Sequence, residues 1–210
     1  MKKLIFILPL LFVFIHSNAI SQNELMPIVK KIDVKSSKES MMKLDKQFNS
    51  YIKKYPGKWL PLYWSAFTKL LISHKSEGLA EKDKWIALAE KEIDLAMPIS
   101  DKKSEVAVLK ALAVSSKIMA DPQKRGPKLV RSLGYWTNKA KMFNPKNPRV
   151  YYIEAMKVMA TPVSMGGGHV KARPIFEKSL AQFKTFSPVS SIYPNWGEGL
   201  VVEELKKIKK

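Results

Sequence analysis

Three consecutive glycines at positions 166–168 separate two stretches that both have the apolar spacing of α-helices, within residues 144–180. The second stretch carries a small, a large and a small residue at offsets of four and three, namely Ala172, Phe176 and Ser179. Small side chains let two helices approach closely, and one large side chain fills the gap between them. This pattern predicts a helical hairpin, in which two antiparallel helices pack across a turn.

The same spacing recurs earlier in the chain, so the hairpin is expected to be one of several. Ala89, Ile93 and Ala96 repeat it, and Ala140 followed by Pro145 is typical of the end of another unit. No sustained strand alternation interrupts the helical patterns. We predict helices over 26–34, 37–54, 59–73, 79–96, 101–119, 129–143, 148–159, 169–183 and 197–209. Short connections favour antiparallel neighbours, so the expected fold is all-α, an antiparallel helical-hairpin array.

Two irregular connections are expected within this array. The basic residues 123–128, which follow Asp121 and Pro122, are predicted to form a connection before the helix at 129. Residues 187–195 contain prolines and are predicted to form another, after which Trp196 pins the C-terminal segment onto the last hairpin.

The first 19 residues have the three parts of a secretory signal peptide. Lys2 and Lys3 form a positive start, residues 4–15 are apolar apart from one proline, and 17–19 fit a small-x-small cleavage site. The apolar run is shorter than the ~20 residues of a spanning helix. We expect cleavage after Ala19, or alternatively after Ser21, which leaves residues 20–210 as a single helical domain that is periplasmic or secreted.

Composition excludes several classes of function. The chain has no cysteine, which removes thiol catalysis, thiolate metal sites and haem attachment through cysteine. Its formal net charge is +19, and loss of Lys2 and Lys3 leaves about +17. Most of the excess is lysine, whereas readers of nucleic-acid sequence favour arginine, so no nucleic-acid partner is expected. A solvated surface explains the charge, and attraction to an acidic partner, glycan or membrane surface is the alternative.

The helix pairs with A-x3-F-x2-A spacing and a closing proline resemble tetratricopeptide repeats. The repeats are degenerate, because Leu133 and Thr137 stand where small and large residues are expected. The whole chain also resembles exported tetratricopeptide-like proteins of Bacteroidetes type, and its glycine hairpin is similar to the periplasmic repeat protein of TRAP-type transporters. The residues that carry the Bacteroidetes resemblance are Pro61, Tyr63, Trp64, Asp121, Pro122, Arg125, Gly126, Asn147, Pro148, Arg149, Tyr151, Tyr152, Thr161, Pro162, Gly166, Gly167, Gly168, Pro194, Asn195, Trp196 and Gly197. Neither resemblance implies an enzymatic activity.

The glycine run is not the phosphate loop of a nucleotide-binding protein. That loop ends in Gly-Lys-Ser/Thr after a strand, whereas here His169 follows Gly168 and a helical pattern precedes it. Two interpretations remain: a tight turn whose backbone needs positive φ, or the rim of a site for a small anionic or peptide ligand. His74 and His169 are the two histidines after residue 19, and neither lies in a cluster with metal-ligand spacing. No metal, cofactor or catalytic group is expected.

These observations predict a non-enzymatic exported protein that binds a protein or peptide, or acts as a scaffold. Its expected site is a groove lined by the first helices of the hairpins and bordered by the glycine loop. The residues predicted to form it are Tyr151, Tyr152, Gly166, Gly167, Gly168, His169 and Trp196. The alternatives are a solute-binding accessory of an envelope transport system and, less favoured, a cell-envelope enzyme.

Overall fold

The computed structural model describes residues 22–208, and all the regular secondary structure in that range is helical. The predicted signal peptide lies outside the described residues. In chain order the helices are α1 (Gln22–Val29), α2 (Lys38–Lys54), α3 (Trp59–Lys75), α4 (Leu79–Ile99), α5 (Lys103–Ala120), α6 (Pro122–Phe143), α7 (Pro148–Ala160), the short 3-10 helix η1 (Val163–Met165), α8 (His169–Thr185) and α9 (Glu198–Ile208). The predicted all-α class is confirmed.

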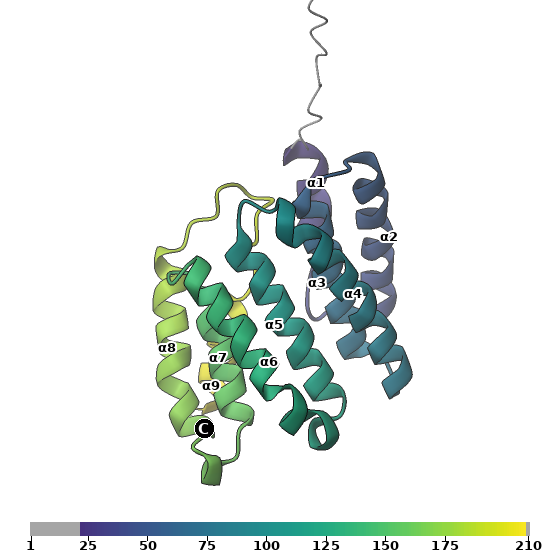
Figure 1. The fold of residues 1–210 in the computed structure, drawn as a ribbon. Coiled ribbons are helices and arrows are strands. Elements are labelled where there is room, and N and C mark those ends of the chain that lie inside the picture. The colour runs from purple at the N-terminus through teal and green to yellow at the C-terminus, as the bar shows by residue number, and fades with distance from the viewer. Residues whose placement is uncertain (1–21, 209–210) are drawn as a thin grey trace, which may run out of the picture.

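The helices pair into successive hairpins that stand side by side (Figure 1). Helix α3 packs on α4, α5 on α6, and α7 on α8, while the first helices of the hairpins also contact one another. Helix α2 covers α3 at one end of the array, and α9 packs on α8 at the other. This arrangement has the antiparallel pairing that the sequence predicts, whereas the assignment to tetratricopeptide repeats stays a prediction.

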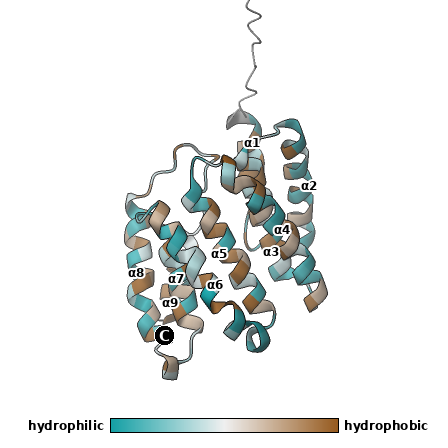
Figure 2. Ribbon diagram, viewed as in Figure 1, coloured by the Kyte–Doolittle hydropathy of each residue, from teal (hydrophilic) through white to brown (hydrophobic). Residues whose placement is uncertain are grey.

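Small residues lie where neighbouring helices meet. Ala89, Ile93 and Ala96 of α4 are fully buried in one apolar cluster with α2 and α3. Ala172 and Phe176 of α8 are fully buried in a second cluster with α7 and α9. Ser179, also fully buried, donates a hydrogen bond to the carbonyl of Pro148 at 2.8 Å, and the carbonyl of Ala140 accepts one from Ser104 at 2.8 Å. Figure 2 shows hydrophobic and hydrophilic residues alternating along the helices, as expected when each helix buries one face.

The prediction of a connection at 123–128 is wrong, because these residues form the first turns of α6. The Asp121 side chain accepts a hydrogen bond from the amide of Lys124 at 3.2 Å and so caps the helix. Pro122 occupies the first turn, where its missing N–H removes no helical bond. Leu133 and Thr137 are buried, so α6 packs without the small-large spacing expected there.

A buried charged cluster joins α2, α3 and α4. The ammonium of Lys69 lies 2.5 Å from Asp45 Oδ1 and 2.7 Å from Glu92 Oε1, and all three side chains are buried. Ser65 donates to the same two carboxylates. Removal of one member would leave an uncompensated buried charge, which is strongly unfavourable.

The segment after α8 runs back across the molecule to the first hairpin (Figure 1). The indole N–H of Trp64 donates to the carbonyl of Ile192 at 2.8 Å, and the rings of Trp59 and Tyr193 meet edge to face, 5.5 Å apart. Trp196 donates to the Tyr63 hydroxyl at 2.8 Å. Helix α3 therefore holds the C-terminal segment, at a sequence separation of more than a hundred residues. The contacts of this segment extend beyond the last hairpin, where the sequence alone placed Trp196.

Candidate functional site

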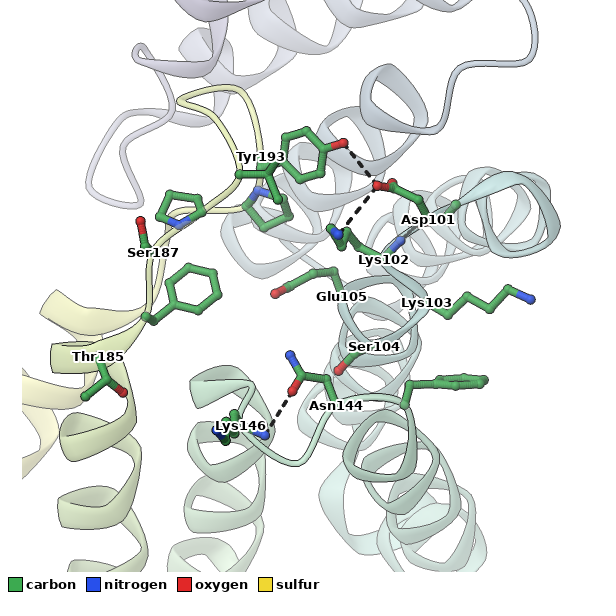
Figure 3. A pocket seen from close by; sticks show the side chains of 16 residues that line it. Asp101, Lys102, Lys103, Ser104, Glu105, Asn144, Lys146, Thr185, Ser187 and Tyr193 are labelled. Atoms are coloured by element: carbon green, nitrogen blue, oxygen red, sulfur yellow. Dashed lines mark hydrogen bonds and ion pairs between the residues drawn. The ribbon is translucent and has the colours of Figure 1, made fainter.

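A pocket of about 790 Å³ opens where the N-terminal end of α5, the α6–α7 loop and the segment after α8 come together (Figure 3). We call it the α5 pocket. Its lining consists of Ser100, Asp101, Lys102, Lys103, Ser104, Glu105, Phe143, Asn144, Lys146, Thr185, Phe186, Ser187, Pro188, Val189, Tyr193 and Pro194. Its volume lies in the range of about 300–1,000 Å³ that is typical of small-molecule sites.

One side of the α5 pocket is apolar. Phe186 and Pro188 are half-buried, whereas Val189 is 67% exposed and Phe143 is 44% exposed. A single exposed apolar residue on a surface needs no explanation. In this pocket the two exposed side chains lie together with the ring of Phe186 and with Pro188. These four residues provide an apolar surface that a flat apolar ligand would cover.

The rim of the α5 pocket is basic. Lys103 and Lys146 are exposed, and Lys102 lies 3.6 Å from the carboxylate of Asp101. The first amides of α5 have no partners within the helix and favour negative charge near them. Opposite them, the Tyr193 hydroxyl donates to Asp101 Oδ2 at 3.2 Å, and burial together with that carboxylate raises the pKa of Tyr193. The phenol therefore stays neutral, and the rim favours anionic ligand groups.

Glu105, which lines the α5 pocket, belongs to a buried ion pair that lies behind the lining. Arg149 is fully buried, and its Nη1 atom lies 3.0 Å from Glu105 Oε1. Asn147 Nδ2 donates to the same oxygen at 3.0 Å, and Arg149 Nη2 donates to the carbonyl of Pro194 at 2.8 Å. Burial raises the pKa of the Glu105 carboxyl, while Arg149 opposes that effect. These contacts connect α5, α7 and the C-terminal segment behind the pocket.

Aromatic rings surround the Arg149 guanidinium. Its central carbon lies 4.8 Å from the ring centre of Phe186, 5.3 Å from that of Trp196 and 5.6 Å from that of Phe183. Cations within about 6 Å of an aromatic face are attracted to it. Arg149 therefore positions Phe186, which is one of the pocket's apolar walls.

The structure brings Tyr152 and Trp196, two of the predicted groove residues, into contact. Their ring centres are 6.4 Å apart, and Trp196 stacks on Phe67 of α3 at 4.7 Å. Burial raises the pKa of Tyr152 to about 12. Tyr151 faces elsewhere, and its hydroxyl donates to the carbonyl of Pro145 at 2.7 Å. The C-terminal segment thus occupies part of the face formed by the first helices of the hairpins.

The structure places the glycine loop at the opposite end of the α7–α8 hairpin from the α5 pocket (Figure 1). Helix α7 has 13 residues, so the two sites are separated by roughly 20 Å. Gly166 and Gly168 have φ of +82° and +91°, which L side chains rarely adopt. His169 is exposed beside them. The groove predicted between the glycine loop and the aromatic residues stays a prediction.

Two features are absent from the described part of the chain. Within residues 22–208, no group of three or more histidine, cysteine, aspartate or glutamate side chains could hold a metal ion. Among the helices in that range, none is long and apolar enough to cross a membrane.

Among solved structures, the chain is similar to the HusA haemophore from Porphyromonas gingivalis. The TM-score is 0.76 and the sequences are 26% identical over 89% of this chain and 90% of that chain. No protein-family model and no curated protein sequence matches the chain. This all-helical relative comes from a member of the Bacteroidetes, which agrees with the Bacteroidetes-type resemblance of the sequence. The tetratricopeptide and TRAP-type resemblances stay predictions.

Proposed function

We propose that this protein is a non-enzymatic, exported binding protein whose ligand is a porphyrin of the haem type, held in the α5 pocket. The observation that carries the proposal is the pairing of apolar walls with a lysine rim in one pocket, within a fold similar to that of a haemophore along 89% of the chain. Because the relative is named for carrying haem, the likeness favours binding over catalysis.

The chemistry of the pocket fits a porphyrin of this type, which is a flat apolar ring with carboxylates on one edge. Phe186, Pro188 and Val189 offer the ring an apolar face, and aromatic contacts of this kind stabilise flat ligands. Lys103 and Lys146 have no ion-pair partner among the described residues, and both line the pocket, so they are free to attract the carboxylates of the ligand. The rim thus attracts the acidic edge, and the apolar wall holds the ring.

Ligation of an iron atom contributes little in this proposal. Side chains that ligate haem iron are those of histidine, cysteine, methionine and tyrosine. Tyr193 is the one residue of these types in the described lining, and its hydroxyl is already bonded to Asp101. We therefore expect iron-free protoporphyrin IX to bind with an affinity close to that of haem.

A titration of the protein with haemin and with protoporphyrin IX, followed by absorbance and tryptophan fluorescence, tests the proposal. The variant Lys103→Glu/Lys146→Glu should bind both ligands about tenfold more weakly or worse, because two attractions become repulsions. The control Lys43→Glu/Lys46→Glu changes the net charge equally on the exposed face of α2, far from the pocket (Figure 1). Equal affinities for the two variants would contradict the assignment of the site.

A protein partner is a second candidate, favoured by the tip of the glycine loop. Val163, Met165 and Val170 are 80%, 75% and 85% exposed there, although the loop itself is tightly built. Exposed apolar residues grouped on one loop are typical of contact surfaces. A pull-down from envelope extract should lose its partner on Val163→Asp/Val170→Asp, and a pull-down that the variant leaves unchanged would count against this role.

A further inference from the structure

One oxygen of the Glu105 carboxyl lacks a hydrogen-bond partner. Oε1 accepts from both Asn147 and Arg149 at 3.0 Å, whereas the buried Oε2 has no partner within the described part of the chain. Glu105 is only 6% exposed, yet it lines the α5 pocket, and Figure 3 shows its side chain directed into the pocket. A buried polar atom without a partner is unfavourable, so this oxygen is suited to meet a polar group of a ligand.

The groups around Glu105 favour a negatively charged ligand group at this place. Arg149 on α7, Lys102 and Lys103 at the start of α5, and Lys146 in the α6–α7 loop are cationic. The N-terminal end of α5 also favours negative charge, because the helix dipole directs its positive end there. The remaining ionisable groups that face Glu105 are Asp101 before α5, Tyr193 in the C-terminal segment and Tyr63 on α3. Burial raises the pKa of Tyr63 well above its ordinary value, so both phenols are neutral.

A carboxylate drawn to this end of α5 would meet a second carboxyl group, Glu105. Two ionised carboxylates at hydrogen-bond distance repel each other, and such pairs retain one proton between them. We propose that Glu105 Oε2 shares a proton with a carboxylate of the bound ligand, and that Glu105 thereby selects ligands with a carboxyl group on the edge that enters the pocket. The proton comes from solvent, and no other bond forms or breaks.

The proposal rests on the proposed function, since a porphyrin of the haem type provides the carboxylate. Burial raises the pKa of Glu105, which agrees with a carboxyl that holds a proton readily. The direct consequence is that ligand binding takes up a proton at any pH at which Glu105 is ionised in the ligand-free protein. Affinity for the ligand should then fall as the pH rises.

Isothermal titration calorimetry with protoporphyrin IX, in buffers of different ionisation enthalpy, counts the protons taken up from about pH 6 to pH 9. The test variant is Glu105→Gln, which keeps an oxygen for Arg149 and offers a permanent N–H donor to the ligand. The control is Glu92→Gln. Glu92 is also buried, pairs with a lysine and has a free Oε2, but it lies in the α2–α3–α4 cluster and does not line the pocket.

Within that pH range the wild type should take up about one proton more than Glu105→Gln at its maximum, and Glu92→Gln should match the wild type. The affinity of Glu105→Gln should also depend less on pH. Equal proton uptake by the wild type and Glu105→Gln would overturn the proposal. An affinity of Glu105→Gln that is tenfold weaker at every pH would also overturn it, because Oε2 would then act only as a hydrogen-bond acceptor that needs no proton.

A second ligand keeps the test decisive even if Glu105→Gln does not fold. The dimethyl ester of protoporphyrin IX has no ionisable carboxyl, so the wild type should bind it more weakly and without the extra proton. Proton uptake that is the same for the acid and the ester would overturn the role of Glu105 while leaving porphyrin binding intact. Absence of any binding of protoporphyrin IX to the wild type would instead overturn both the proposed function and this inference.

Discussion

Replacement of Gly167 by alanine should destabilise the protein, because no space exists for a methyl group. A Cβ atom at this position would lie 2.2 Å from the carbonyl oxygen of Thr161, 2.4 Å from Thr161 Cβ and 2.6 Å from the carbonyl oxygen of Val158. Two of these three neighbours are backbone atoms, which cannot swing aside as the end of a long side chain can. The loop between α7 and α8 must therefore open.

The expected loss of stability follows from the hydrogen bonds that break when the loop opens. The Gly167 amide donates to the carbonyl of Pro162 at 3.1 Å, and the Gly168 amide donates to that of Val158 at 2.9 Å. Each bond contributes about 0.5–1.5 kcal/mol, and overpacking costs about 1–3 kcal/mol more. The expected loss is about 2–6 kcal/mol, or a Tm lower by roughly 4–24 °C for a chain of this size. Gly167→Val should lower the Tm at least as much.

Thermal melts followed by circular dichroism measure the effect, with Gly134→Ala as the matched control. Gly134 lies within α6, and a Cβ atom there meets nothing within 4 Å. Alanine should therefore stabilise that helix by about 0.5–1 kcal/mol. A Tm of Gly167→Ala that equals the wild-type value, or that shifts in the same direction as the Tm of Gly134→Ala, would contradict the close packing of the loop.

Three further substitutions test the packing and the buried charges. Lys69→Met leaves Asp45 and Glu92 buried without their cation and should lower the free energy of unfolding in urea by about 3–5 kcal/mol; a loss below 1 kcal/mol would show that the cluster is hydrated. Trp196→Ala removes the bond to Tyr63 and the stacking on Phe67, so it should cost about 3 kcal/mol and speed proteolysis between residues 186 and 197, whereas unchanged cleavage would contradict the anchoring. Burial raises the pKa of Glu92. A carboxyl whose pKa is higher in the folded than in the unfolded state stabilises the fold most at low pH. This stabilisation is lost as the pH rises through the folded-state pKa. The stability of Glu92→Gln relative to the wild type should therefore improve from pH 4 to pH 8, and a difference that stays constant would contradict the raised pKa.

The helices could be predicted from sequence because their apolar spacing is a local signal. The prediction failed at the start of α6, where Gly126 and Pro127 resemble a turn although Asp121 caps a helix that includes both. Local patterns also explain why the Ala172, Phe176 and Ser179 spacing pointed to a closely packed helix pair.

The site could not be predicted in the same way, because the α5 pocket is assembled from three segments far apart in the sequence. Glu105 and Arg149 look like ordinary helix-surface charges in the sequence, and only the tertiary fold buries them together. Trp196 was expected to contact the last hairpin, but it also reaches α3 through Tyr63. The pair Lys102 and Lys103 was the one local signal available, and in a chain with this many lysines that signal does not stand out.

The most direct test of the porphyrin-binding account is to map the bound ligand by amide chemical shifts in the NMR spectrum of the protein with protoporphyrin IX. The account predicts the largest changes at residues 102–105, 143, 144, 146, 185–189 and 193, which line the α5 pocket, and small changes at residues 163–170. Changes concentrated on the glycine loop, or spread evenly over the lysine-rich surface, would contradict it.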